Sequence, residues 1–362
     1  MKKIMIGILL LIAVACVVGI GLRHQRALSV SSGGKPVVKI GVLLPLSGNM
    51  AHLGNTVKGA IEVAGQDANA QNNRYFYQFL FEDNLLEPMR SAIVLKKLIF
   101  VDKVDAVLSF SSSVGHVIAP VAEENKVPHI SMSSDETMAG GQYNFINWTM
   151  PGSETDKMTE IIQKKGYRSV ALVVLNHQGA LAVSGSLTPK LDAVGIKNKI
   201  LTINPGIRDF RMAIAKLKHQ MNPDLYVMLL FEPEAGIFIK QLRESGAKTD
   251  VTSIELFSFL SHLSLIEGAW YVDAAGANNE TMERIKAHNK SDATYALGTS
   301  YDNVMMLVKA FETAPTKDKA VDVLSGIATY DGVSGRLTRK GNVFDSEAVV
   351  KHIKDGKITI GE

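Results

Sequence analysis

KIGVLLPLSGNMAHLG, residues 39–54, gives the clearest first indication of the fold. An apolar run ends at Pro45 and opens into a turn of small residues, after which a helical pattern begins. We interpret the run as a buried strand that leads through the turn into a helix. In open α/β sheets, ligands bind beyond the carboxyl ends of such strands. The turn is therefore a candidate wall of a binding site.

Strand-like and helix-like patterns alternate through the rest of the chain. Apolar runs at 105–110, 169–175 and 225–231 are typical of buried parallel strands. Helical spacings of apolar residues lie between them, as at Phe210 and Ile214. This order predicts an α/β fold with a parallel sheet, formed twice along the chain.

The composition is that of a large globular protein. The chain has 362 residues, of which 46% are apolar and 21% charged, so it can bury the cores of two domains. The formal net charge is +3, but five basic residues and no acid lie within residues 1–36. The remainder carries 34 basic and 36 acidic side chains, so we expect no nucleic-acid partner.

The first 26 residues have the pattern of a signal peptide or membrane anchor. Two lysines precede a 19-residue apolar run, Ile4–Leu22. Cys16, the only cysteine, follows Ala-Val-Ala as in a lipoprotein cleavage site, whereas the apolar residues beyond it favour an uncleaved anchor. Both interpretations place the body in the periplasm or at the cell surface, without a disulfide. Residues 27–36, rich in Ser and Gly, are expected to form a flexible tether.

Two hydroxyl-rich turns are the first candidate site. Ser111, Ser112 and Ser113 come directly after a predicted strand, and a second such turn begins at Ser131. Hydroxyls and backbone amides at a helix N-terminus suit a carboxylate or another anionic group. Helix capping by one serine, with two serines in solvent, is the alternative.

No motif for catalysis, metal or nucleotide binding occurs in the sequence. The nine histidines form no HExxH pair, and neither a GxSxG elbow, a phosphate loop nor a GxGxxG stretch is present. His52 and His177 lie on predicted loops and are weaker candidates for ligand contacts. We therefore expect a binding protein, not an enzyme, with no cofactor and no metal.

Several segments become informative when they are taken together. Besides residues 39–54 they are FEDNLLEPMRSAIVLKKLI at 81–99, VLSFSSSVGHVIAPVAEENKVPHIS at 107–131, RDFRMAIAKLK at 208–218, FEPEAGIFIKQLRESGAKT at 231–249, YALGTSYDNVMMLVKAFETA at 295–314 and YDGVSGRLTRKGN at 330–342. In this order they resemble the type I periplasmic binding proteins of the leucine/isoleucine/valine (branched-chain amino acid and amide) group, the solute receptors of ABC importers.

The resemblance implies two doubly wound, Rossmann-like α/β lobes around a central cleft that closes over a ligand. We place the three crossovers near Pro151, Ala274 and Tyr330. The expected lobes are residues 37–150 with 275–330, and residues 151–274 with 331–362. The implied partners are a small amino acid, amide or derivative and an ABC permease in the membrane, and the body is expected to be monomeric.

The resemblance also implies individual ligand contacts. A ligand carboxylate would be held by Ser111–Ser113 and by the next strand-end loop, through Ser133 and Asp135. Glu255 would hold an ammonium group by charge-assisted hydrogen bonds, with a solvated acid at a strand end as the alternative. Phe231 would form an apolar or stacking wall.

Departures from the family pattern argue for an unusual ligand. The aromatic side chains that close over the ligand in the family would fall near Leu53 and Ala180, and neither residue is aromatic. Asp135 beside a carboxylate-binding loop would repel an anionic ligand. Two other functions stay open: a sensory or regulatory module of the same fold without transport, and an envelope protein with a degenerate cleft.

Overall fold

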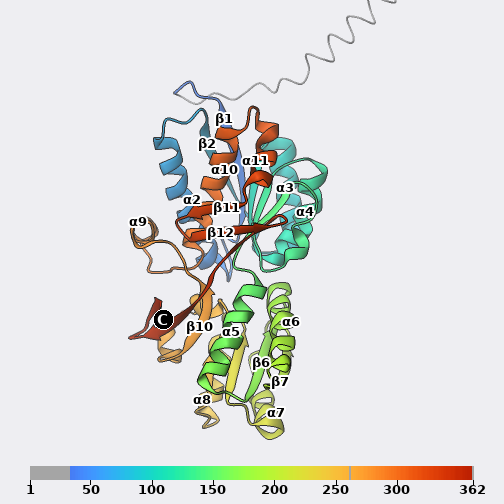
Figure 1. The fold of residues 1–362 in the computed structure, drawn as a ribbon, viewed down its shortest axis with the longest axis vertical. Helices are drawn as coiled ribbons and strands as arrows, with labels where there is room; N and C mark the ends of the chain where they lie inside the picture. The colour runs from blue at the N-terminus through green and yellow to red at the C-terminus, as the bar shows by residue number, and fades with distance from the viewer. Residues whose placement is uncertain (1–32, 261, 361–362) are drawn as a thin grey trace, which may run out of the picture.

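The computed structural model describes residues 33–260 and 262–360. These residues form two α/β lobes stacked end to end (Figure 1). The expected signal or anchor, Cys16 and most of the expected tether lie outside the described residues. Within the described residues, no helix combines the length and the apolar content that crossing a membrane requires.

The first lobe is built on an eight-stranded sheet in the order β11-β12-β13-β5-β4-β3-β1-β2. Strands β1 to β5 and β13 run parallel, whereas β12 pairs antiparallel with both β13 and the edge strand β11. The strands are β1 (Val37–Leu44), β2 (Phe76–Asp83), β3 (Ala106–Phe110), β4 (His129–Met132), β5 (Asn144–Asn147), β11 (Thr329–Gly332), β12 (Gly335–Lys340) and β13 (Val343–Ser346). The helices are α2 (Ala51–Ala70), α3 (Pro88–Lys97), α4 (Ser112–Glu124), α9 (Asn279–Asn289), α10 (Leu297–Thr313) and α11 (Ala320–Gly326).

The second lobe joins a four-stranded parallel sheet, β7-β6-β8-β9, to a three-stranded antiparallel sheet, β10-β14-β15. The amide of Glu255 donates to the carbonyl of Val272 at 2.7 Å and links the two sheets. The strands are β6 (Ser169–Leu175), β7 (Lys197–Ile203), β8 (Leu225–Leu229), β9 (Asp250–Thr252), β10 (Trp270–Ala274), β14 (Ala348–Lys354) and β15 (Lys357–Ile360). The helices are α5 (Pro151–Lys165), α6 (Gln178–Ala193), α7 (Arg211–Met221) and α8 (Glu234–Glu244).

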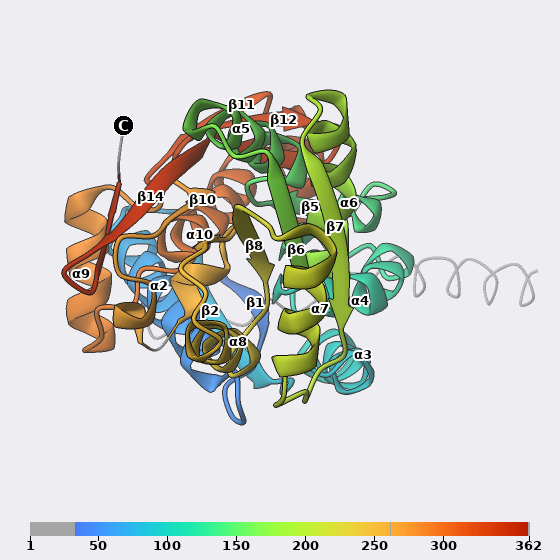
Figure 2. The ribbon, with the colours of Figure 1, turned by 90° about the horizontal axis from the view of Figure 1, so that it is seen from below.

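The alternation of side chains along β6 explains how the second lobe is layered. Leu172 and its even-numbered neighbours pack with α5 and α6, whereas Val173 and its odd-numbered neighbours pack with α7 and α8. Both sets are buried because the sheet is covered on both faces, as the view along the long axis shows (Figure 2). The apolar run at 169–175 therefore has the burial expected of a central parallel strand.

The third crossover differs from the expected position. The segment 331–346 was assigned to the second lobe, but β11, β12 and β13 pair in the first sheet, and Val343 lies beside Ile146 of β5. The hairpin stays there because Asp302 of α10 accepts hydrogen bonds from the amides of Val333 and Ser334, at 2.8 and 2.9 Å. On these pairings we propose a first lobe of residues 37–150 and 275–346 and a second lobe of residues 151–274 and 347–360.

A buried histidine links three strands of the first sheet and makes the stability depend on pH. The ring of His129 is hydrogen-bonded to Ser109 Oγ at 2.8 Å and to Asn144 Oδ1 at 2.9 Å. Burial lowers the pKa of His129 to about 4, although the hydrogen bond with Asn144 opposes the shift. The folded protein therefore holds this imidazole neutral.

We expect this histidine to destabilise the protein in mild acid. The unfolded chain takes up a proton near pH 6.5 and the folded chain only near pH 4, so stability is complete above pH 6.5 and is lost as the pH falls through this window. Between pH 7.5 and pH 5 the free energy of unfolding should fall by about 2 kcal/mol through this group. Urea unfolding at both pH values measures the loss. The His129→Gln variant should lose about 2 kcal/mol less between them, and an equal loss would contradict the assignment.

Candidate ligand-binding site

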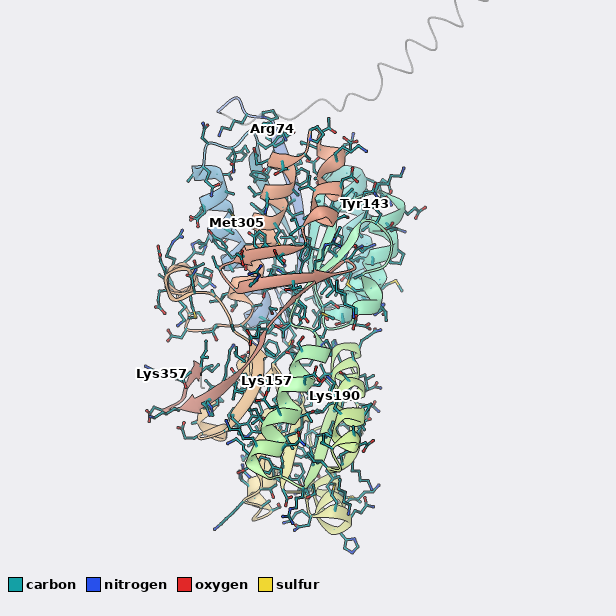
Figure 3. All side chains as sticks on the ribbon, viewed as in Figure 1. Arg74, Tyr143, Lys157, Lys190, Met305 and Lys357 are labelled. Carbon is teal, nitrogen blue, oxygen red and sulfur yellow. The ribbon has the colours of Figure 1, made fainter. Side chains whose placement is uncertain are left out.

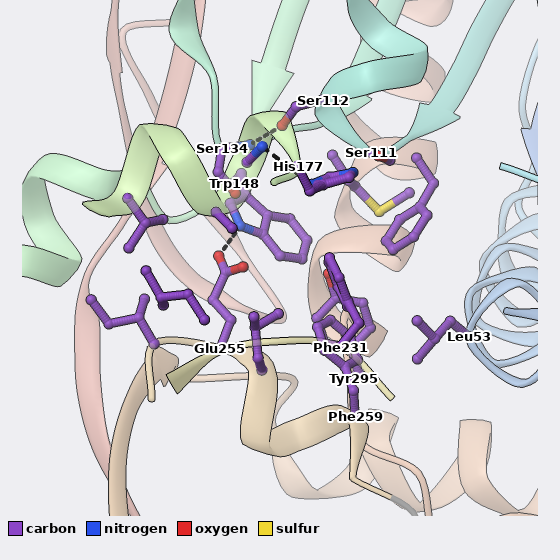
Figure 4. Close-up of a pocket in the computed structure, with 18 of the residues that line it drawn as sticks. Leu53, Ser111, Ser112, Ser134, Trp148, His177, Phe231, Glu255, Phe259 and Tyr295 are labelled. Atoms are coloured by element: carbon purple, nitrogen blue, oxygen red, sulfur yellow. Dashed lines mark hydrogen bonds between the residues drawn. The ribbon is translucent and has the colours of Figure 1, made fainter. Parts of the chain in front are cut away.

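A cavity lies between the two lobes, where the strands of both parallel sheets end (Figure 4). Its enclosed part measures about 50 Å³, and about 600 Å³ lies between the lining side chains when the opening to solvent is included. The enclosed part is smaller than typical small-molecule sites, which run from about 300 to 1,000 Å³. The cavity is narrow because side chains of both lobes project into it.

Two helix N-termini meet at one end of the cavity. Ser111 and Ser112 begin α4 of the first lobe, and His177 and Gly179 begin α6 of the second. Ser112 Oγ accepts hydrogen bonds from Ser133 Oγ at 3.1 Å and from the Ser134 amide at 3.2 Å, so its position is fixed. Free amides and the positive ends of two helix dipoles suit an anionic group.

His177 adds a hydrogen-bond donor to this end. Its Nδ1 accepts from the amide of Gly179 at 3.3 Å, so the ring proton lies on Nε2. Nε2 is buried, and no hydrogen-bond partner within the described residues reaches it. Burial lowers the pKa of His177 and keeps the ring neutral. A ligand oxygen beside His177 would satisfy this donor.

Aromatic rings form the apolar wall of the cavity. Tyr295 lies at the centre, with ring centroids 4.0 Å from Phe259, 5.5 Å from Trp148 and 5.9 Å from Phe110. Phe231 packs on Phe259 at 5.6 Å. The rings come from both lobes, so a flat or branched apolar group would contact both lobes at once.

Glu255 lies across the cavity from the helix N-termini (Figure 4). Its side chain is buried, and Oε1 accepts a hydrogen bond from the indole of Trp148. Burial, followed by the negative charge of Asp273, raises the pKa of Glu255 to about 8. Near neutral pH this carboxyl group can therefore act as a donor or as an acceptor.

Two residues that line the cavity have a backbone conformation that side chains disfavour. Ser111 has a φ of 84° and Glu255 a φ of 60°. Such conformations cost on the order of 1–3 kcal/mol each and persist where a functional geometry requires them. Ser111 opens α4 directly after β3, and Glu255 follows the bond that joins the two sheets of the second lobe.

A model of the family described as periplasmic binding protein matches residues 37–357 of the chain. The chain belongs to the periplasmic binding protein family. This confirms the resemblance drawn from the sequence, and it agrees with the expectation of a binding protein and not an enzyme. Within the described residues, no group of three or more His, Cys, Asp and Glu side chains is placed to hold a metal ion.

Known relatives of this periplasmic binding protein share its fold at low sequence identity. The Leu/Ile/Val-binding protein BraC3 of Rhizobium johnstonii is 22% identical over 88% of this chain and 84% of its own length. The leucine-binding protein LivK of Thermotoga maritima superposes with a TM-score of 0.81 at 21% identity, over 90% and 98% of the two chains. An ABC-transporter solute-binding protein of R. palustris, solved with 4-hydroxybenzoate, superposes with a TM-score of 0.80 at 16% identity, over 90% and 95%.

The cavity of this periplasmic binding protein brings together four of the seven residues singled out in the sequence. Ser111, Ser112, Phe231 and Glu255 line it. The other three, Ser113, Ser133 and Asp135, lie behind this lining: Ser113 Oγ is 3.2 Å from Ser111 Oγ, and Ser133 supports Ser112. Leu53 and Ala180 also line the cavity, at the expected places.

Asp135, which the resemblance implies as a ligand contact, lies outside the lining of the cavity. Its carboxylate lies 2.7 Å from Nε2 of His116 and accepts a hydrogen bond from Gln178 of the second lobe at 3.2 Å. Burial raises the pKa of Asp135, but the hydrogen bonds from His116 and Thr137 outweigh it and hold the pKa below its usual value. Asp135 is thus satisfied by protein groups outside the lining, and the expected repulsion of an anionic ligand has no basis in the cavity wall.

The sequence analysis missed most of the aromatic wall. Phe110, Trp148, Phe259 and Tyr295 line the cavity, although the expected lid positions carry Leu and Ala. Phe110 ends β3 and Trp148 follows β5, so their places at strand ends were a usable signal. Phe259 ends a short 3-10 helix before β10 and Tyr295 lies just before α10, and only the folded chain brings them to the cavity.

Proposed function

We propose that this protein is the extracytoplasmic solute receptor of an ABC importer. It encloses a small carboxylate-bearing ligand, an amino acid or a derivative of one, between its lobes and delivers it to a membrane permease. The observation that carries the proposal is the cavity, which places two helix N-termini opposite a buried acid with aromatic rings between them.

Each part of the cavity supports one part of this ligand. The amides at the starts of α4 and α6, with His177 Nε2, suit a carboxylate. The rings around Tyr295 suit an apolar or aromatic side chain. Glu255 suits an ammonium group when ionised and a hydroxyl group when protonated.

Proteins of the same fold suggest two classes of ligand, amino acids and aromatic acids. A protein of the same fold is a leucine-binding protein, and another was solved with 4-hydroxybenzoate. The aromatic lining of the cavity favours large apolar or aromatic amino acids and hydroxylated aromatic acids over small polar amides.

The transport mechanism we propose is closure of the lobes on the ligand. Ser111 and Ser112 contact the ligand from the first lobe and His177, Phe231 and Glu255 from the second, so binding stabilises the closed arrangement. The permease recognises that arrangement. We further propose that residues 1–26 hold the body at the membrane, through an anchor or through a lipid on Cys16. The body acts as a monomer.

Thermal unfolding with a ligand panel tests this function. At a concentration 100-fold above its dissociation constant, a ligand should stabilise the protein by about 2.7 kcal/mol. For a protein of this size we expect a rise in melting temperature of about 4 °C. The panel should hold amino acids, amides, short peptides and hydroxylated benzoates. A panel of this breadth without any shift would refute the proposal.

A further inference from the structure

A second buried acid stands behind Glu255. Glu154 lies in the first turn of α5, and its side chain is fully buried. No hydrogen-bond donor within the described residues reaches either of its carboxyl oxygens. The group within hydrogen-bonding reach is the carboxyl group of Glu255. Two acids therefore face each other. Glu255 lines the ligand cavity, and Glu154 lies behind it.

The nearby basic groups do not neutralise this pair. Lys351 of β14 donates to Asp273 of β10 at 2.9 Å, and both side chains are buried, so its charge is already matched. Lys157 and Lys190 (Figure 3) pair with two other acids of α5, Glu160 and Asp156. Glu154 thus has no counter-charge of its own.

The remaining groups around the pair are negative or neutral. Asp345 of β13 accepts from the Met150 amide at 2.8 Å and from Ser153 Oγ at 2.6 Å, and it adds a negative charge beside Glu154. Tyr295 and Trp148 are neutral. Two facing carboxylates cannot both ionise in such surroundings, because their repulsion is hardly screened by water.

We propose that Glu154 holds a proton at neutral pH and donates it to Glu255, so that Glu154 is the positioning residue that sets the charge which Glu255 presents to the ligand. The role of the pair in binding rests on the proposed function, whereas the proton itself can be measured without any ligand. When Glu255 is ionised, this hydrogen bond satisfies both carboxyl groups with a single proton.

Because of this pair, the direction in which ligand affinity changes with pH shows which kind of ligand group contacts Glu255. Burial first, and the charge of Glu255 second, raise the pKa of Glu154 well above its usual value, whereas the pKa of Glu255 is about 8. Below pH 8 the pair takes up a second proton, on Glu255. An ammonium group needs ionised Glu255, so its affinity should rise with pH up to about 8. A ligand that accepts the Glu255 proton should bind more weakly above that pH.

Trp148 reports the protonation of Glu255 directly, because its indole donates to that carboxyl group. The chain has two tryptophans, so Trp270→Phe leaves Trp148 as the one fluorophore of its kind. In this background, with no ligand present, fluorescence should titrate with a midpoint near pH 8, and Glu255→Gln should remove the transition. Glu154→Gln keeps a donor and should leave the midpoint within about one pH unit, whereas Glu154→Met should raise it by about 1–2 units.

Infrared difference spectra at pH 9 give a second measurement, which needs only the conservative variant. The unsubstituted protein should show the carbonyl band of a protonated carboxyl group that Glu154→Gln lacks. Circular dichroism checks that each variant is folded. Equal midpoints for Glu154→Gln and Glu154→Met, or a protonated-carboxyl band that Glu154→Gln retains in full, would overturn the proposal and leave the solute-receptor function untouched. A ligand panel without any shift would refute the solute-receptor function and leave the proposed proton on Glu154 untouched.

Discussion

Replacing Ala180 by tryptophan should abolish ligand binding, with a loss of affinity of at least about 100-fold, or about 2.7 kcal/mol. Ala180 lies in the first turns of α6, lines the cavity and is 6% exposed. An indole at this position occupies the space between the helix N-termini and the aromatic wall. The ligand then has no room, whatever its identity. Calorimetric titration with any compound that shifts the melting temperature measures the effect.

The neighbouring residue provides the matched control. Leu181 is 41% exposed and does not line the cavity. Leu181→Trp adds a similar side chain to the same helix, and its affinity should stay within about threefold of the unsubstituted protein. Binding that survives Ala180→Trp, in a variant with an unchanged melting temperature, would place the ligand elsewhere.

Replacing Gly54 by alanine should destabilise the fold by at least about 3 kcal/mol, because the new methyl group has no space. A Cβ on Gly54 would lie 2.0 Å from the carbonyl oxygen of Pro45. Gly54 lies in the first turn of α2, and the oxygen it would meet belongs to the backbone just after β1, so a side-chain rotation cannot relieve the contact. Chemical unfolding measures the change as a lower midpoint with an unchanged slope.

A glycine in an open place gives the opposite expectation. Gly185 lies on the exposed side of α6, and a Cβ there would meet no atom within 4 Å. Gly185→Ala should therefore stabilise the protein by about 0.5–1 kcal/mol through helix propensity. If Gly54→Ala and Gly185→Ala changed the free energy of unfolding in the same direction, the close approach of α2 to Pro45 would not be the reason that residue 54 is glycine.

Most of the central strands could be predicted from the local sequence pattern, because buried parallel strands are apolar along their whole length. The runs at 105–110 and 169–175 became β3 and β6 for this reason. The hairpin after Tyr330 was misassigned because its lobe depends on contacts with Asp302, far away in the sequence. Pairing between distant segments leaves little trace in a single sequence.

The site was predicted in part. Ser111 and Ser112 could be predicted because hydroxyls at a strand end are chemically conspicuous, whereas Glu255 was predicted from the family resemblance. Glu154 lies at the start of a helix, a position where acids are common, so nothing in the sequence singles it out. Its importance arises from burial against Glu255, which only the packing of α5 on the second lobe creates. The aromatic wall around Tyr295 has the same origin.

The low sequence identity to the relatives agrees with a fold that is easier to predict than the site. The two solved structures have identities of 21% and 16% and TM-scores near 0.8, so the framework is kept while side chains change. The cavity is then a better guide to the ligand than the relatives are. Its carboxylate end, aromatic wall and titrating acid define the class of compounds to test.

Native mass spectrometry tests the central claim most directly, namely that a small carboxylate binds in the cavity between the lobes. The unsubstituted protein and the Ala180→Trp and Leu181→Trp variants should each be incubated with amino acids and hydroxylated aromatic acids. We expect a one-to-one complex for the unsubstituted protein and for Leu181→Trp, and none for Ala180→Trp. A complex that Ala180→Trp retains in full, or the absence of any complex for the unsubstituted protein, would contradict the account.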